Sequence, residues 1–74
     1  MKYVLVGLYD NNQITVANAN TWHWDDITGM LNVYDVDDKI ALSIRQDEVT
    51  YIFRATSDEE RENIMRFLDN HYKK

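Results

Sequence analysis

The side chains best able to do chemistry lie in two short acidic stretches in the first half of the chain. Residues 22–26 (Trp-His-Trp-Asp-Asp) place two indole rings beside two carboxylates, and residues 35–38 (Asp-Val-Asp-Asp) supply three more carboxylates. Aromatic side chains are enriched among the residues that dominate binding energy at protein interfaces, and carboxylates form charge-assisted hydrogen bonds with basic groups. The sequence therefore predicts one acidic, partner-binding face. Its members are Trp22, Trp24, Asp25, Asp26, Asp35, Asp37 and Asp38. The alternative is that a small domain without disulfides uses one or both tryptophans in its core.

The charge distribution agrees with a basic partner. The net charge is −5, and residues 3–38 contain six aspartates but no lysine or arginine, whereas acids and bases balance in residues 39–74. Negative charge concentrated in one half repels nucleic acid and anionic membranes and attracts basic surfaces. Direct binding to DNA, RNA or a membrane is therefore not expected. The alternative interpretation is that this charge serves only solubility.

Metal-binding patterns are incomplete. If Asp35 began a calcium loop, the fifth position would be Lys39, the sixth Ile40 and the twelfth Gln46, where oxygen ligands, glycine and glutamate are required. His23, Asp25 and His71 have no spacing that predicts a shared metal. We therefore expect neither a metal nor another cofactor.

Catalytic patterns are also missing. Cysteine is absent, Ser43 falls inside an expected strand, and Ser57 has the position of a helix cap. Two glycines, Gly7 and Gly29, cannot form a glycine-rich phosphate loop. The sequence predicts a protein that is not an enzyme.

The expected elements are strands followed by one helix. Residues 3–9 are almost continuously apolar, which predicts a central strand covered on both faces, with Gly7 admitting a large neighbour. Alternation predicts further strands over 13–17, 30–36, 40–45 and 49–55, the last two with one face toward a core. Residues 18–20 suggest a loop. Residues 21–24 favour a strand, because tryptophans two apart share a face only in extended chain; a helical turn over 21–26 is the alternative.

The last segment predicts an amphipathic helix over about residues 57–72. Ser57 and Glu60 have the spacing of a capping box, in which Glu60 reaches back to the Ser57 amide. His71 is expected in the core with one nitrogen hydrogen-bonded. The apolar stripe consists of Ile64, Phe67, Leu68 and His71, flanked by Met65 and Tyr72. The predicted fold class is α+β: an antiparallel meander of five to six strands, strongly curved, with one C-terminal helix packed on the sheet.

These features define the functional hypothesis. With 74 residues and no proline, residues 1–74 are expected to form one small domain without a linker, and no apolar run predicts a signal peptide or membrane span, so a cytoplasmic location is expected. The best-supported function is a small acidic protein-binding module. It would act as an inhibitor or modulator of a basic, nucleic-acid-binding partner, as phage or mobile-element proteins do. A structural, self-associating domain is the alternative, and small-ligand binding in the sheet–helix cleft is a weaker one. A monomer or weak homodimer is expected, because sheet edges can pair with another chain.

Overall fold

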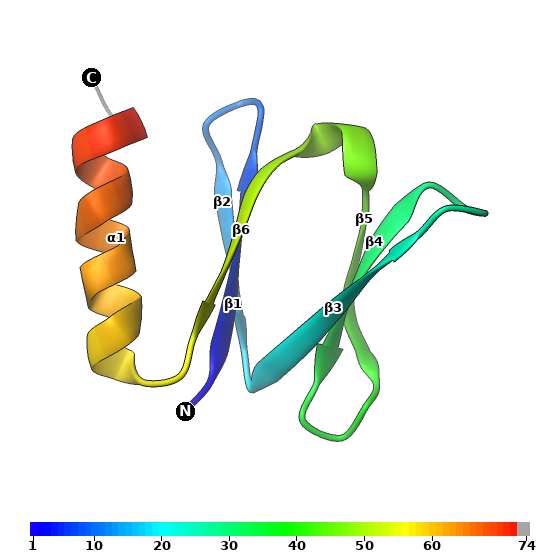
Figure 1. Cartoon of the computed structure of the whole chain (residues 1–74), viewed down its shortest axis with the longest axis horizontal. Coiled ribbons are helices and arrows are strands. Elements are labelled where there is room, and N and C mark those ends of the chain that lie inside the picture. Colours follow the sequence, from blue (N-terminus) through cyan, green and yellow to red (C-terminus); the bar gives the residue numbers. More distant parts are fainter. Residues whose placement is uncertain (73–74) are drawn as a thin grey trace.

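The computed structural model describes residues 1–72, which form six antiparallel strands in two sheets and a C-terminal helix (Figure 1). The first sheet has the order β2-β1-β6 and the second the order β3-β4-β5. The strands are β1 (Tyr3–Leu8), β2 (Gln13–Ala17), β3 (Ala19–Asp25), β4 (Met30–Asp35), β5 (Ile40–Arg45) and β6 (Val49–Ala55). A 3-10 turn, η1 (Gln46–Glu48), joins β5 to β6, and α1 (Asp58–Tyr72) follows β6. The predicted α+β class with antiparallel strands and one terminal helix is confirmed.

The first sheet is the middle layer, between α1 and the second sheet (Figure 1). Its central strand, β1, is covered on both faces, as its continuous apolar sequence predicted. Val4 and Val6 belong to the core between the sheets, and the alternate residue Leu5 is equally inaccessible to solvent. The second sheet completes this core with Ala19, Leu31 and Val33.

Gly7 allows the ring of Tyr51 to lie directly on the backbone of β1. A Cβ atom added to Gly7 would lie 1.9 Å from Cε2 of Tyr51, far inside any permitted contact. Tyr51 also packs against Phe53, with 5.5 Å between ring centroids. The predicted close approach at Gly7 is therefore confirmed.

The start of α1 is held by its own cap and by contacts to β1. The Glu60 amide donates to Oγ of Ser57 at 3.1 Å, which confirms the predicted cap. The predicted return bond from Glu60 to the Ser57 amide is not formed. Oε1 of Glu60 accepts instead from the amide of Thr56 at 3.3 Å. The Tyr3 hydroxyl donates to Asp58 at 2.5 Å, which raises the pKa of Tyr3. The helix is thereby tied to the first strand.

The buried face of α1 is narrower than the apolar stripe suggested. Leu68 is buried, whereas Phe67 is 49% exposed. His71 is also exposed and stacks on Phe67 at 4.2 Å, so the prediction of a core histidine is wrong. One side of the helix rests on β6, and these two rings lie beyond the contact. The side chain of Tyr72, also assigned to the stripe, lies outside the described residues.

The segment between β2 and β3 corrects another prediction. Asn18 alone turns the chain, with a left-handed φ of 56°, and Ala19 already begins β3 as a fully buried residue. The predicted loop over 18–20 is thus wrong, because asparagine tolerates the left-handed region and one residue suffices for the corner. The strand expected over 21–24 is confirmed, and its helical alternative is wrong. Within residues 1–72, no helix has the length and apolar character needed to cross a membrane.

Candidate functional site

The seven residues expected to form one face are divided between two turns. Asp25 and Asp26 lie at the β3–β4 turn, whereas Asp35, Asp37 and Asp38 lie at the β4–β5 turn, at the other end of β4 (Figure 1). A six-residue strand at about 3.3 Å per residue separates such turns by roughly 15–20 Å. The single acidic face predicted from the sequence is therefore not formed.

Asp25 organises its own turn. Its Oδ1 accepts hydrogen bonds from the amides of Ile27 at 3.0 Å and Thr28 at 3.4 Å, and these bonds lower the pKa of Asp25. Gly29 closes the turn with a φ of 72° and donates its amide to the Asp25 carbonyl at 2.8 Å. Within residues 1–72, the exposed carboxylate of Asp26 has no hydrogen bond or ion pair. Asp26 is thus the carboxylate of this turn that remains exposed and without a bond within the described residues.

Asp35 has the same structural role at the other end of β4. Its Oδ1 accepts from the amides of Asp37 at 2.9 Å and Lys39 at 3.0 Å. Asp38 adopts a left-handed φ of 61°, as a tight turn requires. The carboxylates of Asp37 and Asp38 are exposed to solvent, so this turn presents two charges.

The tryptophans lie on the inner face of β3, opposite Val33 and Leu31 of β4. Trp22 is half-buried against the core, and the guanidinium of Arg54 lies 5.1 Å from its ring centroid. Trp24 is 42% exposed, because it is farther along the edge strand and less completely covered. One ring therefore serves the core while the other remains accessible.

A hollow of about 290 Å³, here called the tryptophan groove, lies between β3 and β6. Trp22 and Trp24 form one wall, and residues 49–52 form the other. Both strands are edges, each with a strand partner on one side only. Asp26, in the β3–β4 turn, lies two residues along the chain from Trp24 in the groove wall.

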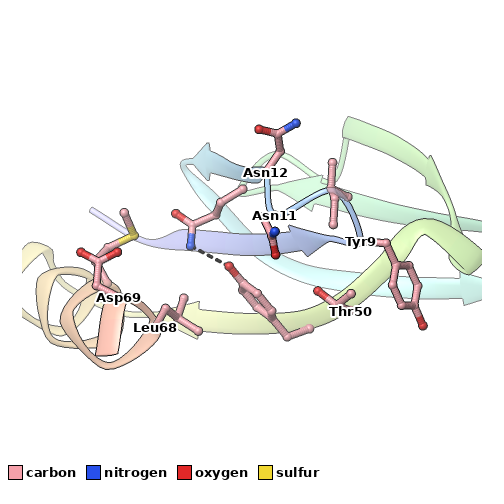
Figure 2. Close-up of a pocket in the computed structure, with 10 residues that line it drawn as sticks. Tyr9, Asn11, Asn12, Thr50, Leu68 and Asp69 are labelled. Carbon is pink, nitrogen blue, oxygen red and sulfur yellow. Dashed lines mark hydrogen bonds between the residues drawn. The ribbon is translucent and has the colours of Figure 1, made fainter. Parts of the chain in front are cut away.

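A second and larger hollow of about 590 Å³, here called the sheet–helix cavity, lies between the first sheet and α1 (Figure 2). The β1–β2 turn, the start of β6 and the C-terminal half of α1 line it. Nε2 of Gln13 donates to the hydroxyl of Tyr51 across its wall at 2.9 Å. Sequence reasoning placed a cleft between sheet and helix but named none of these residues, because they come from three distant segments.

The described residues contain no group of three or more His, Asp or Glu side chains arranged to hold a metal ion. Neither hollow therefore offers a metal centre built from residues 1–72. The chemistry available to both consists of stacking, hydrogen bonding and charge pairing.

Comparison with known proteins defines the fold. No protein-family model matches the chain, and no curated protein does. The chain is similar to an X-ray structure of a Northeast Structural Genomics Consortium target, with 26% sequence identity and a TM-score of 0.55. The match covers 77% of this chain and 96% of that chain. A similar fold thus recurs in another solved protein, and any functional argument must come from the site itself.

Proposed function

We propose that this protein is a small acidic protein-binding module whose binding site is the tryptophan groove together with Asp26. The observation that carries the proposal is the exposure of Trp24. A ring that is 42% exposed, on the wall of a hollow and two residues from an unpaired carboxylate, combines the aromatic anchor and the charge that interfaces use.

The chemistry of the site defines the partner. Trp22 already carries the guanidinium of Arg54 over its ring, so this part of the molecule accepts cation–π contact. A partner with an arginine or lysine beside an apolar side chain would place the cation over Trp24, near Asp26, and the apolar group in the groove. Such basic surfaces are common on proteins that bind nucleic acid. Occupying one would make this protein an inhibitor or modulator, a role that we expect in the cytoplasm.

The turn at the other end of β4 has a smaller part. Asp37 and Asp38 are too far from the groove to touch the same side chain, but they belong to the net charge of −5. Charges outside the contact act mainly on the rate of association and its salt dependence. This difference supplies a matched control.

The test uses a defined probe, a short peptide of alternating arginine and leucine, and a second peptide with every arginine replaced by glutamate. We expect saturable quenching or enhancement of tryptophan fluorescence with the basic peptide alone, weakening as salt is raised. Trp24→Ala should mainly raise the dissociation rate, and Asp26→Asn should slow association and flatten its salt dependence.

Asp37→Asn is the control, because it removes the same charge at the opposite end of β4. It should change binding much less than Asp26→Asn does. If the two substitutions had equal effects, the acidic residues would act only through the net charge of the protein, and Asp26 would have no specific role in binding. If the Trp24→Ala variant bound the basic peptide as tightly as the wild type, the tryptophan groove would not be the binding site.

A further inference from the structure

The sheet–helix cavity has the size and walls of a small-molecule site. Its volume of about 590 Å³ falls in the range of roughly 300–1,000 Å³ that is typical of ligand pockets. Met65 and Leu68 supply apolar surface, and Asn11, Thr50 and Asp69 supply polar groups from three separate elements. An apolar surface with a few polar groups along it is the usual composition of such pockets.

The wall formed by the first sheet is rigid. Tyr51 is held against the backbone of Gly7 on one side and by the hydrogen bond from Gln13 on the other. A fixed wall reduces the entropy lost when a ligand binds, because fewer side chains must be ordered.

Hydrogen bonds within the β1–β2 turn also fix its conformation. The carboxylate of Asp10 accepts from the amide of Asn12 at 3.0 Å and from its side chain at 2.8 Å, and the Leu8 amide donates to the Asn12 carbonyl at 2.9 Å. Asn11 therefore occupies a defined left-handed position with a φ of 68°. Its side chain points toward the middle of the lining residues, whereas Asn12 and Tyr9 point away (Figure 2).

The polar groups favour a neutral ligand rich in hydroxyls. The side chains of Asn11, Thr50 and Asp69 have no hydrogen-bond partner in the described part of the chain, so their donors and acceptors are available. Asn11 and Thr50 can both donate and accept, and Asp69 accepts two hydroxyl donors. Among the described residues that line the cavity, Asp69 is the one carboxylate and there is no lysine or arginine. This charge disfavours a phosphate or carboxylate ligand.

We infer that the sheet–helix cavity binds a small neutral polyhydroxylated molecule, such as a sugar, whose hydroxyls pair with Asn11, Thr50 and Asp69 and whose apolar face rests on Met65 and Leu68. This site is distinct from the proposed protein-binding site, because Trp24 and Asp26 do not line the cavity, although Thr50 and Tyr51 of β6 line both hollows.

The test is a titration of the isotope-labelled protein by NMR with glucose, galactose and N-acetylglucosamine, with inorganic phosphate and ethylenediamine as charged comparisons. We expect saturable shifts, with at least one of the sugars, at residues 11–13 and 50–51 and at the side-chain amide of Asn11. Asn11→Gly removes the amide while preserving the left-handed backbone, and Asp69→Asn preserves shape. Each should weaken binding about tenfold or more, as the loss of a hydrogen bond to a ligand does.

Asn63→Ala, on an exposed position of α1 outside the cavity, is the matched control and should leave the affinity unchanged, as should Trp24→Ala. The inference is overturned if no sugar gives saturable shifts, if phosphate or ethylenediamine binds more tightly than every sugar, or if Asn63→Ala weakens binding as much as Asn11→Gly. Failure of the peptide test at the tryptophan groove would leave these results unaffected.

Discussion

Replacing Gly7 by alanine tests the packing that holds β1, β6 and the cavity wall together. The added Cβ would lie 1.9, 2.2 and 2.3 Å from three ring atoms of Tyr51, so the ring must retreat by about 1.5 Å to reach ordinary contact near 3.4 Å. That movement breaks the 2.9 Å hydrogen bond from Gln13 and disturbs the contact with Phe53. Overpacking of this kind costs about 1–3 kcal/mol, which corresponds to a fall in Tm of roughly 5–20 °C for a domain of this size.

A double-mutant cycle with Tyr51→Ala identifies the cause. Urea unfolding followed by tryptophan fluorescence gives the free energy of unfolding of the wild type, both single variants and the double variant. Once the Tyr51 ring is removed, Gly7→Ala should cost almost nothing or stabilise by about 0.5 kcal/mol, because alanine restricts the unfolded chain more than glycine does. An equal loss in both backgrounds would refute the clash. Gly29→Ala is the comparison, because nothing lies within 4 Å of its Cβ position and its cost should come from a φ of 72° alone.

Three further predictions concern the helix, the acidic turn and the oligomeric state. Leu68→Ala should cost about 2–5 kcal/mol in urea unfolding and Phe67→Ala much less, because Leu68 is 5% exposed and Phe67 49%; equal losses would contradict this orientation of α1. The pKa of Asp25 is lowered in the folded state, so its ionised carboxylate stabilises the fold. This contribution is fully present above the unfolded pKa of about 3.9 and is lost as pH falls through the lower folded pKa. Asp25→Asn should therefore flatten the acid side of stability against pH, measured by urea midpoints between about pH 2 and 6, and an unchanged slope would exclude the turn as its source. Light scattering over a hundredfold concentration range should show a monomer or weak dimer, and a large stable oligomer would contradict the expectation that the open strand edges pair only weakly.

The correct sequence predictions rest on patterns that local physics decides. The apolar run of β1 requires cover on both faces, and the structure places the core between the sheets on one face and the α1 side on the other. The cap at Ser57 depends on atoms three residues apart, so tertiary contacts hardly alter it. The two tryptophans required a strand because only an extended chain puts them on one face.

The wrong predictions depend on contacts between distant segments. The helical pattern gives an apolar stripe but not the angle at which α1 meets β6, so it wrongly predicts that His71 lies in the core although this residue is exposed. Ala19 between two asparagines resembles a loop, and its burial comes from packing against β1 and β4. In β6, alternation suggested one buried face, yet both faces are used. A register shift opposite Gly7 and Leu8 places Val49 and Ile52 together against the core.

The division of the acidic residues was available from the sequence. Turns that precede and follow one strand must lie at its opposite ends, and residues 30–36 were already expected to be a strand between the two acidic stretches. Charge counting along the chain ignores this geometry. The carboxylates also differ in their roles, since Asp25 and Asp35 each accept two amides of their own turn, a pattern that aspartate at the start of a turn favours.

Strand β6 is the element that both candidate sites share, and this governs how they can be tested separately. Its residues Thr50 and Tyr51 line both the tryptophan groove and the sheet–helix cavity, because the register shift beside Gly7 brings this part of the strand to the rim of each. A substitution in β6 would therefore disturb both sites and could not assign an effect to either. Trp24 belongs to the groove alone and Asp69 to the cavity alone, so a loss of peptide binding confined to Trp24→Ala and a loss of sugar binding confined to Asp69→Asn would establish two independent sites.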